Sequence, residues 1–314
     1  MKQAKIDQVS LNIRRSLSNL RAGLQQFNPH LKTIKLDEEV ENTVNAFLIK
    51  KGLIRQVSVR DELKNILFYN LRFNREAKTI LSEEINWDDV NFDIATSAQD
   101  CLAAYALVFA RYEPLGFNDL TLVEDSKIKS HEIRSLIPGL TYDDNDKRSV
   151  TAILRKGGQL NGTLRLISGS TGLLPAEKLF NKQKGLQHIR NQQAKNGKSI
   201  SEISKLALHE NASPMVHYRT LLVAKSLIAK PLNIGNEISV VPKSEFDRRY
   251  QRIGFVAELT QRFYRELGEP DVICSWDQDT QLSEYYQNIV EKETRRSIPQ
   301  SSHIGSLCRL FSQA

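Results

Sequence analysis

The chain has 314 residues, a formal net charge of +7 and a pI of about 9.2. Hydrophobic residues make up 40% of it and charged residues 26%, which excludes a chain that is disordered or fibrous throughout. No apolar run approaches the ~18 residues of a membrane helix, so we expect no membrane partner. Three widely spaced cysteines, without a secretory signal near residue 1, predict a reduced, cytoplasmic protein.

The basic charge is concentrated in two segments. Residues 1–36 carry a net charge of +6 and residues 141–230 one of +9, whereas residues 37–140 carry −6 and residues 231–314 carry −2. Blocks of one sign are typical of proteins that bind a polyanion. A solvated basic surface without a partner is the alternative.

Helical spacing dominates the first 137 residues. Apolar residues from Val9 to Leu24 recur every three or four positions, which predicts an amphipathic helix. Further helices are expected at 37–52, at 59–81 and after Ser97, which forms a capping box with Asp100 ahead of a helix that is apolar on every side. Residues 1–137 are therefore predicted to form a helical domain of unknown role.

The pattern changes at residue 138. Residues 141–148 are predicted as a polar linker, and the runs 149–156 and 162–168 as two strands joined through Gly157 and Gly158. Residues 138–175 thus form a linker and a short β element. Helical spacing resumes near Ala176, a long helix is expected from Ser244 to Leu267, and residues 271–314 hold a last helix and a tail. The predicted fold class is mostly α with a small β element.

Residues 197–231 predict a helix-turn-helix, within a DNA-binding domain at 176–270. Ser199 caps a first short helix, residues 209–212 form a polar break, and Ser213 with Pro214 begins a second helix. Val216, Thr220, Leu221 and Ala224 would pack inward. Ser213, Met215, Tyr218, Arg219 and Lys225 would face the DNA major groove. An ordinary helical hairpin in a core is the alternative, and Leu222 on the groove side favours it.

Other basic residues would contact DNA phosphates. They lie in the basic block and are Arg148, Arg155, Lys156, Arg165, Lys182 and Lys184. Together with the recognition helix, they predict sequence-specific binding of double-stranded DNA.

The stretch ISEISKLALHENASPMVHYRTLLVAKSL resembles the helix-turn-helix of ParB-type partition proteins, which bind centromere-like sites. NGTLRLISGSTGLLPA resembles that family's strand-turn element, and NKQK at 181–184 resembles its Asn-x-Gln-Arg element, so the resemblance covers about residues 160–245. It implies replicon maintenance by a protein located on the nucleoid or a plasmid, with a partition ATPase and a second copy of the chain as candidate partners. Thr171 and Gly172 stand where the family's loop arginines grip CTP, so we expect no cofactor.

Several alternatives remain open. Residues 133–140 resemble a segment of replication-terminus binding proteins, and an interaction protein without enzymatic activity is a further possibility. A divergent nuclease or recombinase is the enzymatic alternative. No motif supports an enzyme, because the glycines at 157–162 lack the Lys-Ser/Thr of a P-loop. The scattered histidines, and the acidic run at 143–146 without the Gly and Glu of a calcium loop, predict no metal.

Overall fold

A computed structural model describes residues 29–53, 57–80, 85–87, 90–115, 139–179, 184–212, 216, 220–221, 228–229, 232–261 and 269–278. The chain divides into two compact units, residues 1–54 and residues 55–314. Among the described helices, none is long and apolar enough to cross a membrane. The helix predicted at 9–24 lies outside the described residues, and so does the last helix predicted within 271–314, which was expected at residues 282–295.

In the first unit, helix α2 (Pro29–Lys50) includes most of the helix predicted at 37–52 and begins earlier. Its apolar residues recur every four positions and are buried: Leu36, Val40, Val44 and Leu48. The helix ends because Gly52 takes a φ of +70°, where the N–H of Leu53 reaches back to the carbonyl of Leu48. A left-handed glycine is a common C-terminal cap.

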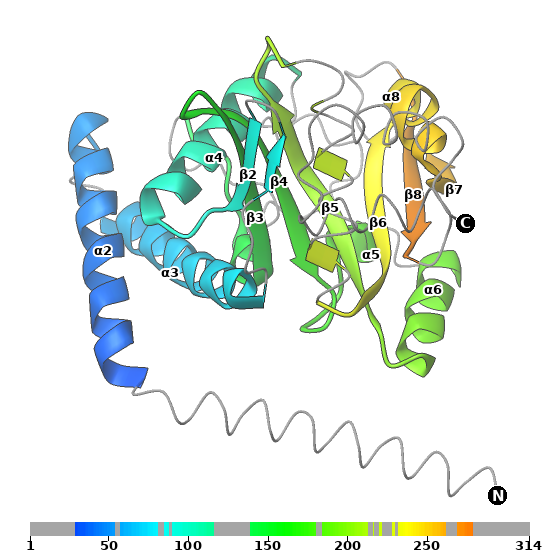
Figure 1. The fold of residues 1–314 in the computed structure, drawn as a ribbon, viewed down its shortest axis with the longest axis horizontal. Helices are drawn as coiled ribbons and strands as arrows, with labels where there is room; N and C mark the ends of the chain where they lie inside the picture. Colours follow the sequence, from blue (N-terminus) through cyan, green and yellow to red (C-terminus); the bar gives the residue numbers. More distant parts are fainter. Residues whose placement is uncertain are drawn as a thin grey trace, which may run out of the picture. The chain divides into compact units, whose positions relative to one another are not determined.

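The second unit is built on a mixed sheet (Figure 1). Its described strands are β1 (Ile85–Trp87), β2 (Val90–Ile94), β3 (Ser149–Lys156), β4 (Gln159–Ser168), β5 (Ser199–Leu208), β6 (Ile234–Pro242), β7 (Val256–Gln261) and β8 (Asp271–Asp277). They lie in the order β1-β2-β3-β4-β5-β6-β8-β7, and every described neighbour is antiparallel except the central pair β5–β6. The prediction of a mostly α fold is therefore wrong.

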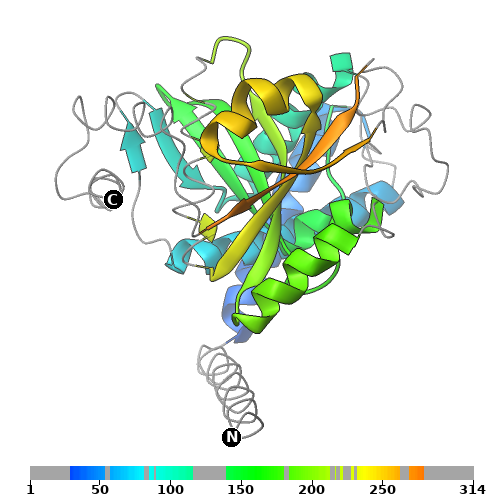
Figure 2. The ribbon, with the colours of Figure 1, turned by 90° about the vertical axis from the view of Figure 1, so that its right-hand side faces the viewer.

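Helices pack on both sides of this sheet (Figure 2). The described ones are α3 (Val57–Ile80), α4 (Ala98–Tyr112), η1 (Glu113–Leu115), η3 (Asp144–Arg148), α5 (Pro175–Leu179), α6 (Lys184–Lys195), α8 (Lys243–Glu245), η5 (Phe246–Tyr250) and η6 (Gln251–Ile253). The α3 helix matches the one predicted at 59–81. The α4 helix begins where the Ser97 side chain accepts the N–H of Asp100, as expected, but Ala103 and Ala110 are exposed, so it is not buried on every side.

The β3–β4 hairpin confirms the two strands predicted on either side of Gly157 and Gly158. Both glycines have positive φ, +55° and +80°, and they form the two-residue connection between Lys156 and Gln159. Positive φ at both central positions is the mark of the tight turn that matches the twist of a hairpin.

The long helix predicted from Ser244 to Leu267 is wrong beyond residue 253. Gly254 takes a φ of +101° and ends the helical segment, and strand β7 begins at Val256. The acidic segment predicted as a polar linker also differs, because Thr141, Tyr142, Asp143 and Asp146 are buried.

Two apolar clusters cover opposite faces of the central strands. Ile167, Ile200 and Ile238 pack with Leu174 of the loop before α5 and Leu186 of α6. The other cluster contains Leu164, Leu166, Ile203, Val241 and Trp276, together with Tyr250 of η5. Ile200 and Ile203 of β5 thus lie on opposite faces of the sheet. Because both faces are covered, this strand carries apolar residues on both sides.

Candidate functional site

The two central strands separate partway along their length. Strand β5 pairs with β6 from Ser199 to Ile203, whose partner is Ser239. Beyond that step β5 stays paired with β4 up to Leu208, and β6 stays paired with β8 up to Pro242. Within the described residues, no ladder pair joins 204–208 to 240–242. The parallel pair therefore opens at its carboxyl end, in the middle of the sheet.

A β-bulge accompanies this separation. The β4–β5 register shifts between Thr163, which faces Ala207, and Arg165, which faces Ser204. Two residues of β5 thus stand opposite one residue of β4, and Lys205 takes a φ of +50°. Bulges bend a strand and increase its twist. This one lies at the point where β5 leaves β6.

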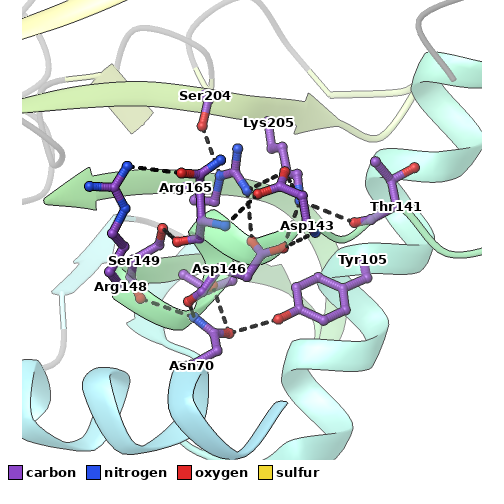
Figure 3. Close-up of polar contacts among 12 residues, drawn as sticks. Asn70, Tyr105, Thr141, Asp143, Asp146, Arg148, Ser149, Arg165, Ser204 and Lys205 are labelled. Atoms are coloured by element: carbon purple, nitrogen blue, oxygen red, sulfur yellow. Dashed lines mark hydrogen bonds and ion pairs between the residues drawn. The ribbon is translucent and has the colours of Figure 1, made fainter. Parts of the chain in front are cut away.

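A buried ionic cluster contacts the bulge (Figure 3). The Lys205 ammonium lies 2.8 Å from Asp146 Oδ2 and 3.1 Å from Asp143 Oδ2. The Arg165 guanidinium lies 2.7 Å from Asp143 Oδ2 and 3.0 Å from Asp146 Oδ1. The basic side chains are 7% exposed and the acidic ones 1%. Two positive and two negative charges therefore neutralise one another away from water.

The surrounding chain holds the two aspartates in place. Asp143 caps η3, and the Asp146 carboxylate accepts the Asp143 N–H at 2.7 Å. From α3, the Asn70 amide donates to the carbonyl oxygens of Asp146 and Ser149, at 2.8 and 3.0 Å. The Tyr105 hydroxyl of α4 donates in turn to Asn70 Oδ1. Contacts from η3 and α3, which do not involve Arg165 or Lys205, thus fix the positions of both aspartates.

Protonation follows the same arrangement. Burial opposes ionisation of Asp143, but the charges of Arg165 and Lys205 and the hydrogen bonds it accepts hold its pKa well below its usual value. Burial also opposes the charge of Arg165, yet Asp143 and Asp146 raise the pKa of that guanidinium above its usual value. Asp143 and Arg165 thus stabilise each other's charged forms.

A second polar group lies on the face of the sheet that carries α5. Glu202, one residue before the last paired step, is 5% exposed and accepts the Ala176 N–H at 2.8 Å. Burial lowers the pKa of the Arg148 guanidinium, and the charge of Glu202 opposes that shift. Arg148 also donates to the carbonyl oxygens of Ser168 and Leu173, so it holds the loop between β4 and α5.

Two hydroxyl groups, those of Ser239 and Tyr250, lie on the other face of the sheet from Glu202, near the point where β5 and β6 separate. The Ser239 hydroxyl donates to the Ile203 carbonyl at 3.2 Å, at the last step where the strands pair. Tyr250 shares a hydrogen bond with Ser239 and is 3% exposed. Burial raises the pKa of this phenol above its usual value, so its proton is retained at neutral pH.

The residues predicted to bind DNA do not come together in the described structure. Arg165 is buried in the ionic cluster, Arg148 holds a loop, and Arg155 pairs with Asp100. Lys156 is exposed at the end of β3, and Lys184 is the first residue of α6. The others lie outside the described residues: Ser213, Met215, Tyr218, Arg219, Lys225 and Lys182.

The helix-turn-helix prediction is wrong. The first helix that Ser199 was expected to cap is strand β5, in the centre of the sheet. Val216, Thr220 and Leu221 are helical and buried, as their spacing predicted, but they belong to the connection between two parallel strands. The ParB resemblance, the DNA partner, the partition ATPase and the role in replicon maintenance depended on this motif and are wrong with it. The location on the nucleoid or a plasmid is not supported either, nor are the alternatives of a replication-terminus binding protein and a non-enzymatic interaction protein.

Neither a protein family nor a curated protein matches the chain by sequence. Among 177 matching solved chains, FeeM, an N-acyl amino acid synthase from uncultured soil microbes, is 18% identical with a TM-score of 0.44, covering 63% of this chain and 93% of FeeM. The AHL synthase LasI is 11% identical with a TM-score of 0.42, covering 60% and 90%. A ribosomal-protein-S5-alanine acetyltransferase from Vibrio fischeri is 10% identical with a TM-score of 0.37, covering 63% and 97%. These values are too low to assign an activity to this chain.

Sequence reasoning missed Glu202, Lys205 and Tyr250 as site residues. The sequence did contain a signal for the end of the helical segment that holds Tyr250. Gly254 follows Tyr250 by four residues, and Gly commonly ends helices. Glu202 and Lys205 stood inside the segment interpreted as a helix, and no local pattern marks a bulge there.

Proposed function

We propose that the chain is an acyltransferase that moves an acyl group from a pantetheine thioester to an amine. The single observation that carries this proposal is the separation of the parallel strands β5 and β6 after Ile203. In open α/β sheets, ligands bind beyond the carboxyl ends of parallel strands, and β5 and β6 are the parallel pair among the described strands of this sheet. The opening lies at that edge, between two strands that each continue for several residues.

A pantetheine arm suits such an opening. It is extended and carries two amide groups, so its N–H and C=O groups can pair with exposed strand backbone as an added strand does. Residues 204–208 of β5 and 240–242 of β6 have no ladder pairs with each other. They offer backbone groups on both sides of the arm, and the thioester would lie near Ile203 and Ser239.

The polar residues on the two sides of the opening divide the work of the reaction. Glu202 would accept the proton of the attacking amine, and Tyr250 would donate its proton to the departing thiolate. The amine nitrogen forms the new bond to the carbonyl carbon, and the carbon–sulfur bond breaks. Glu202 contacts α5 and Tyr250 belongs to the cluster on the other face, so attack and departure occur from opposite sides of the sheet.

The test is transfer from defined thioesters. Purified protein is incubated with acyl-CoA and acyl-carrier-protein thioesters of several chain lengths and with a panel of primary amines. Free thiol is followed by colour and amide product by mass spectrometry. We expect Tyr250→Phe and Glu202→Gln each to lower kcat by about a hundredfold, the lower range for losing one acid or base.

A matched control separates chemistry from folding. Tyr105→Phe also removes a buried tyrosine hydroxyl, but that hydroxyl donates to Asn70, in the ionic cluster rather than at Ser239. It should leave kcat nearly unchanged. Failure of the wild-type protein to release thiol from every thioester and amine tested would rule out the proposal, as would equal rates in Tyr250→Phe and Tyr105→Phe.

A further inference from the structure

Lys205 holds a backbone conformation that its own side chain disfavours. Its φ of +50° lies in the left-handed region, where residues with a Cβ are uncommon. Such a conformation persists only when the surroundings impose it. Asn233 is the other described non-glycine residue with positive φ, and Asn adopts this region far more readily than Lys does. Something beyond local preference therefore keeps Lys205 in place.

The ionic cluster supplies that constraint. The Lys205 ammonium is bound by Asp146 and Asp143, donates to the Thr141 carbonyl at 3.4 Å, and lies 5.7 Å from the centre of the Tyr105 ring. The carboxylates are fixed by η3 and α3, which lie outside β5. Residue 205 must turn its side chain toward them, and the preceding residue, Ser204, faces the same cluster by accepting the Arg165 Nε–H at 2.8 Å. Two successive residues of a strand can face one side only at a bulge.

We propose that Lys205 is a positioning residue, whose ion pairs with Asp143 and Asp146 hold the β5 bulge and thereby keep β5 separated from β6. This inference rests on the proposed function for its consequence, which is that the donor thioester finds its opening already formed. Lys205 touches neither reactant. It acts through the backbone of residues 204–208, and its loss should weaken donor binding more than it slows the chemistry.

The same cluster would be a costly way to gain stability alone. Buried ion pairs are commonly no more stabilising than apolar residues of similar volume, whereas they do fix geometry in some systems. Here the geometry that they would fix is the one that a lysine resists. The arrangement therefore fits a constraint on shape better than a contribution to stability.

The experiment uses two charge-balanced double variants of the full chain. Lys205→Met with Asp146→Asn removes one positive and one negative charge, keeps the Arg165–Asp143 pair, and leaves a side chain that disfavours positive φ. Lys205→Gly with Asp146→Asn removes the same charges but places a residue that adopts positive φ without strain. Asn74→Ala is the stability control, because Asn74 donates to the Ala95 carbonyl and accepts the Thr151 N–H, both away from β5.

Two readouts are compared on folded protein. In the Met variant we expect backbone amide exchange in residues 204–208 to rise about tenfold. The KM for the thioester should rise about tenfold, with kcat changed less than about threefold. The Gly variant should recover much of both losses, although it removes more packing. Asn74→Ala should lower the melting temperature without changing either quantity.

Each result decides the matter. Unchanged exchange and KM in the folded Met variant would overturn the role of Lys205, and so would a Gly variant as impaired as the Met variant. Because amide exchange needs no substrate, it tests the bulge even if the wild-type protein transfers no acyl group. In that case faster exchange in the Met variant alone would support the role of Lys205 in holding the bulge, while the proposed function would fail.

Discussion

The two sides of strand β5 are built in opposite ways. Toward β4 the strand is paired along almost its whole length, and oppositely charged side chains from η3, β4 and β5 bind one another beside it. Toward β6 the pairing stops at Ile203, where the Ser239 hydroxyl donates to the Ile203 carbonyl oxygen. Ion pairs fix the side of β5 that faces β4, whereas on the side that faces β6 the pairing ends at a hydrogen bond between neutral groups.

This difference shows how one strand can serve both a core and an opening. Charged contacts in a water-free interior are directional and costly to break, so they suit the side that must not move. A pair of parallel strands that separates leaves backbone groups for a ligand on the other side. Substitutions on the charged side should therefore have larger effects than substitutions on the side that faces β6.

The largest effect is expected on the charged side. Arg165→Met leaves Asp143 and Asp146 buried with Lys205 as their one remaining cation in the cluster. Removing one partner of a buried ionic group typically costs about 3–5 kcal/mol, so the free energy of unfolding should fall by that amount. Urea denaturation measures it. Arg72→Met is the matched control, because the Arg72–Glu76 pair is 58% and 49% exposed and should contribute little. Comparable losses in the two variants would show that the cluster does not fix this side.

The second effect is a dependence of stability on pH. Because the pKa of Asp143 is lower in the folded protein than in the unfolded chain, its contribution is complete above the unfolded pKa of about 3.9. It is lost as pH falls from there through the folded pKa, by an amount on the order of 2 kcal/mol. The free energy of unfolding, measured in urea from pH 6 to pH 2, should thus fall more steeply for the wild type than for Asp143→Asn. Parallel pH dependences of the free energy of unfolding in the two proteins would contradict a lowered pKa of Asp143 in the folded state.

The β3–β4 hairpin and strand β5 also differ in how far the sequence predicted them. The hairpin was predicted because its signals are local, two strand-forming runs on either side of Gly157 and Gly158. Strand β5 was interpreted as a helix because Ile200, Ile203 and Leu206 recur every three residues. In the structure Ile200 and Ile203 face opposite sides of a sheet covered on both, and the bulge at Lys205 shifts the alternation again.

The ionic cluster could not be predicted from local sequence patterns, for a different reason. Asp143 and Asp146 stand in a run of polar residues, which usually marks a solvated segment. Their burial is tolerable only because Arg165 and Lys205, from two strands further along the chain, neutralise them. Arg165 was assigned to a DNA surface for the same reason, since nothing local shows that two carboxylates meet it. A site assembled from long-range pairs requires the sheet topology to be known first.

The smallest effect on the free energy of unfolding is expected from removing one hydroxyl group on each side of β5. Ser239 donates to the Ile203 carbonyl at 3.2 Å where the strands separate, and Thr163 of β4 donates to the Ala152 carbonyl at 2.8 Å within fully paired strands. Ser239→Ala and Thr163→Val should each lower the free energy of unfolding by about 1 kcal/mol, the usual net value of such a bond. Their local effects should differ, because neighbouring ladder bonds hold the Ala152 region in place, whereas Ile203 is the last residue of β5 that pairs with β6. Amide exchange measured by mass spectrometry should therefore accelerate at residues 203–206 in Ser239→Ala and stay nearly uniform in Thr163→Val. A local response of equal size in both variants would mean that the open side of β5 is held as firmly as the charged side.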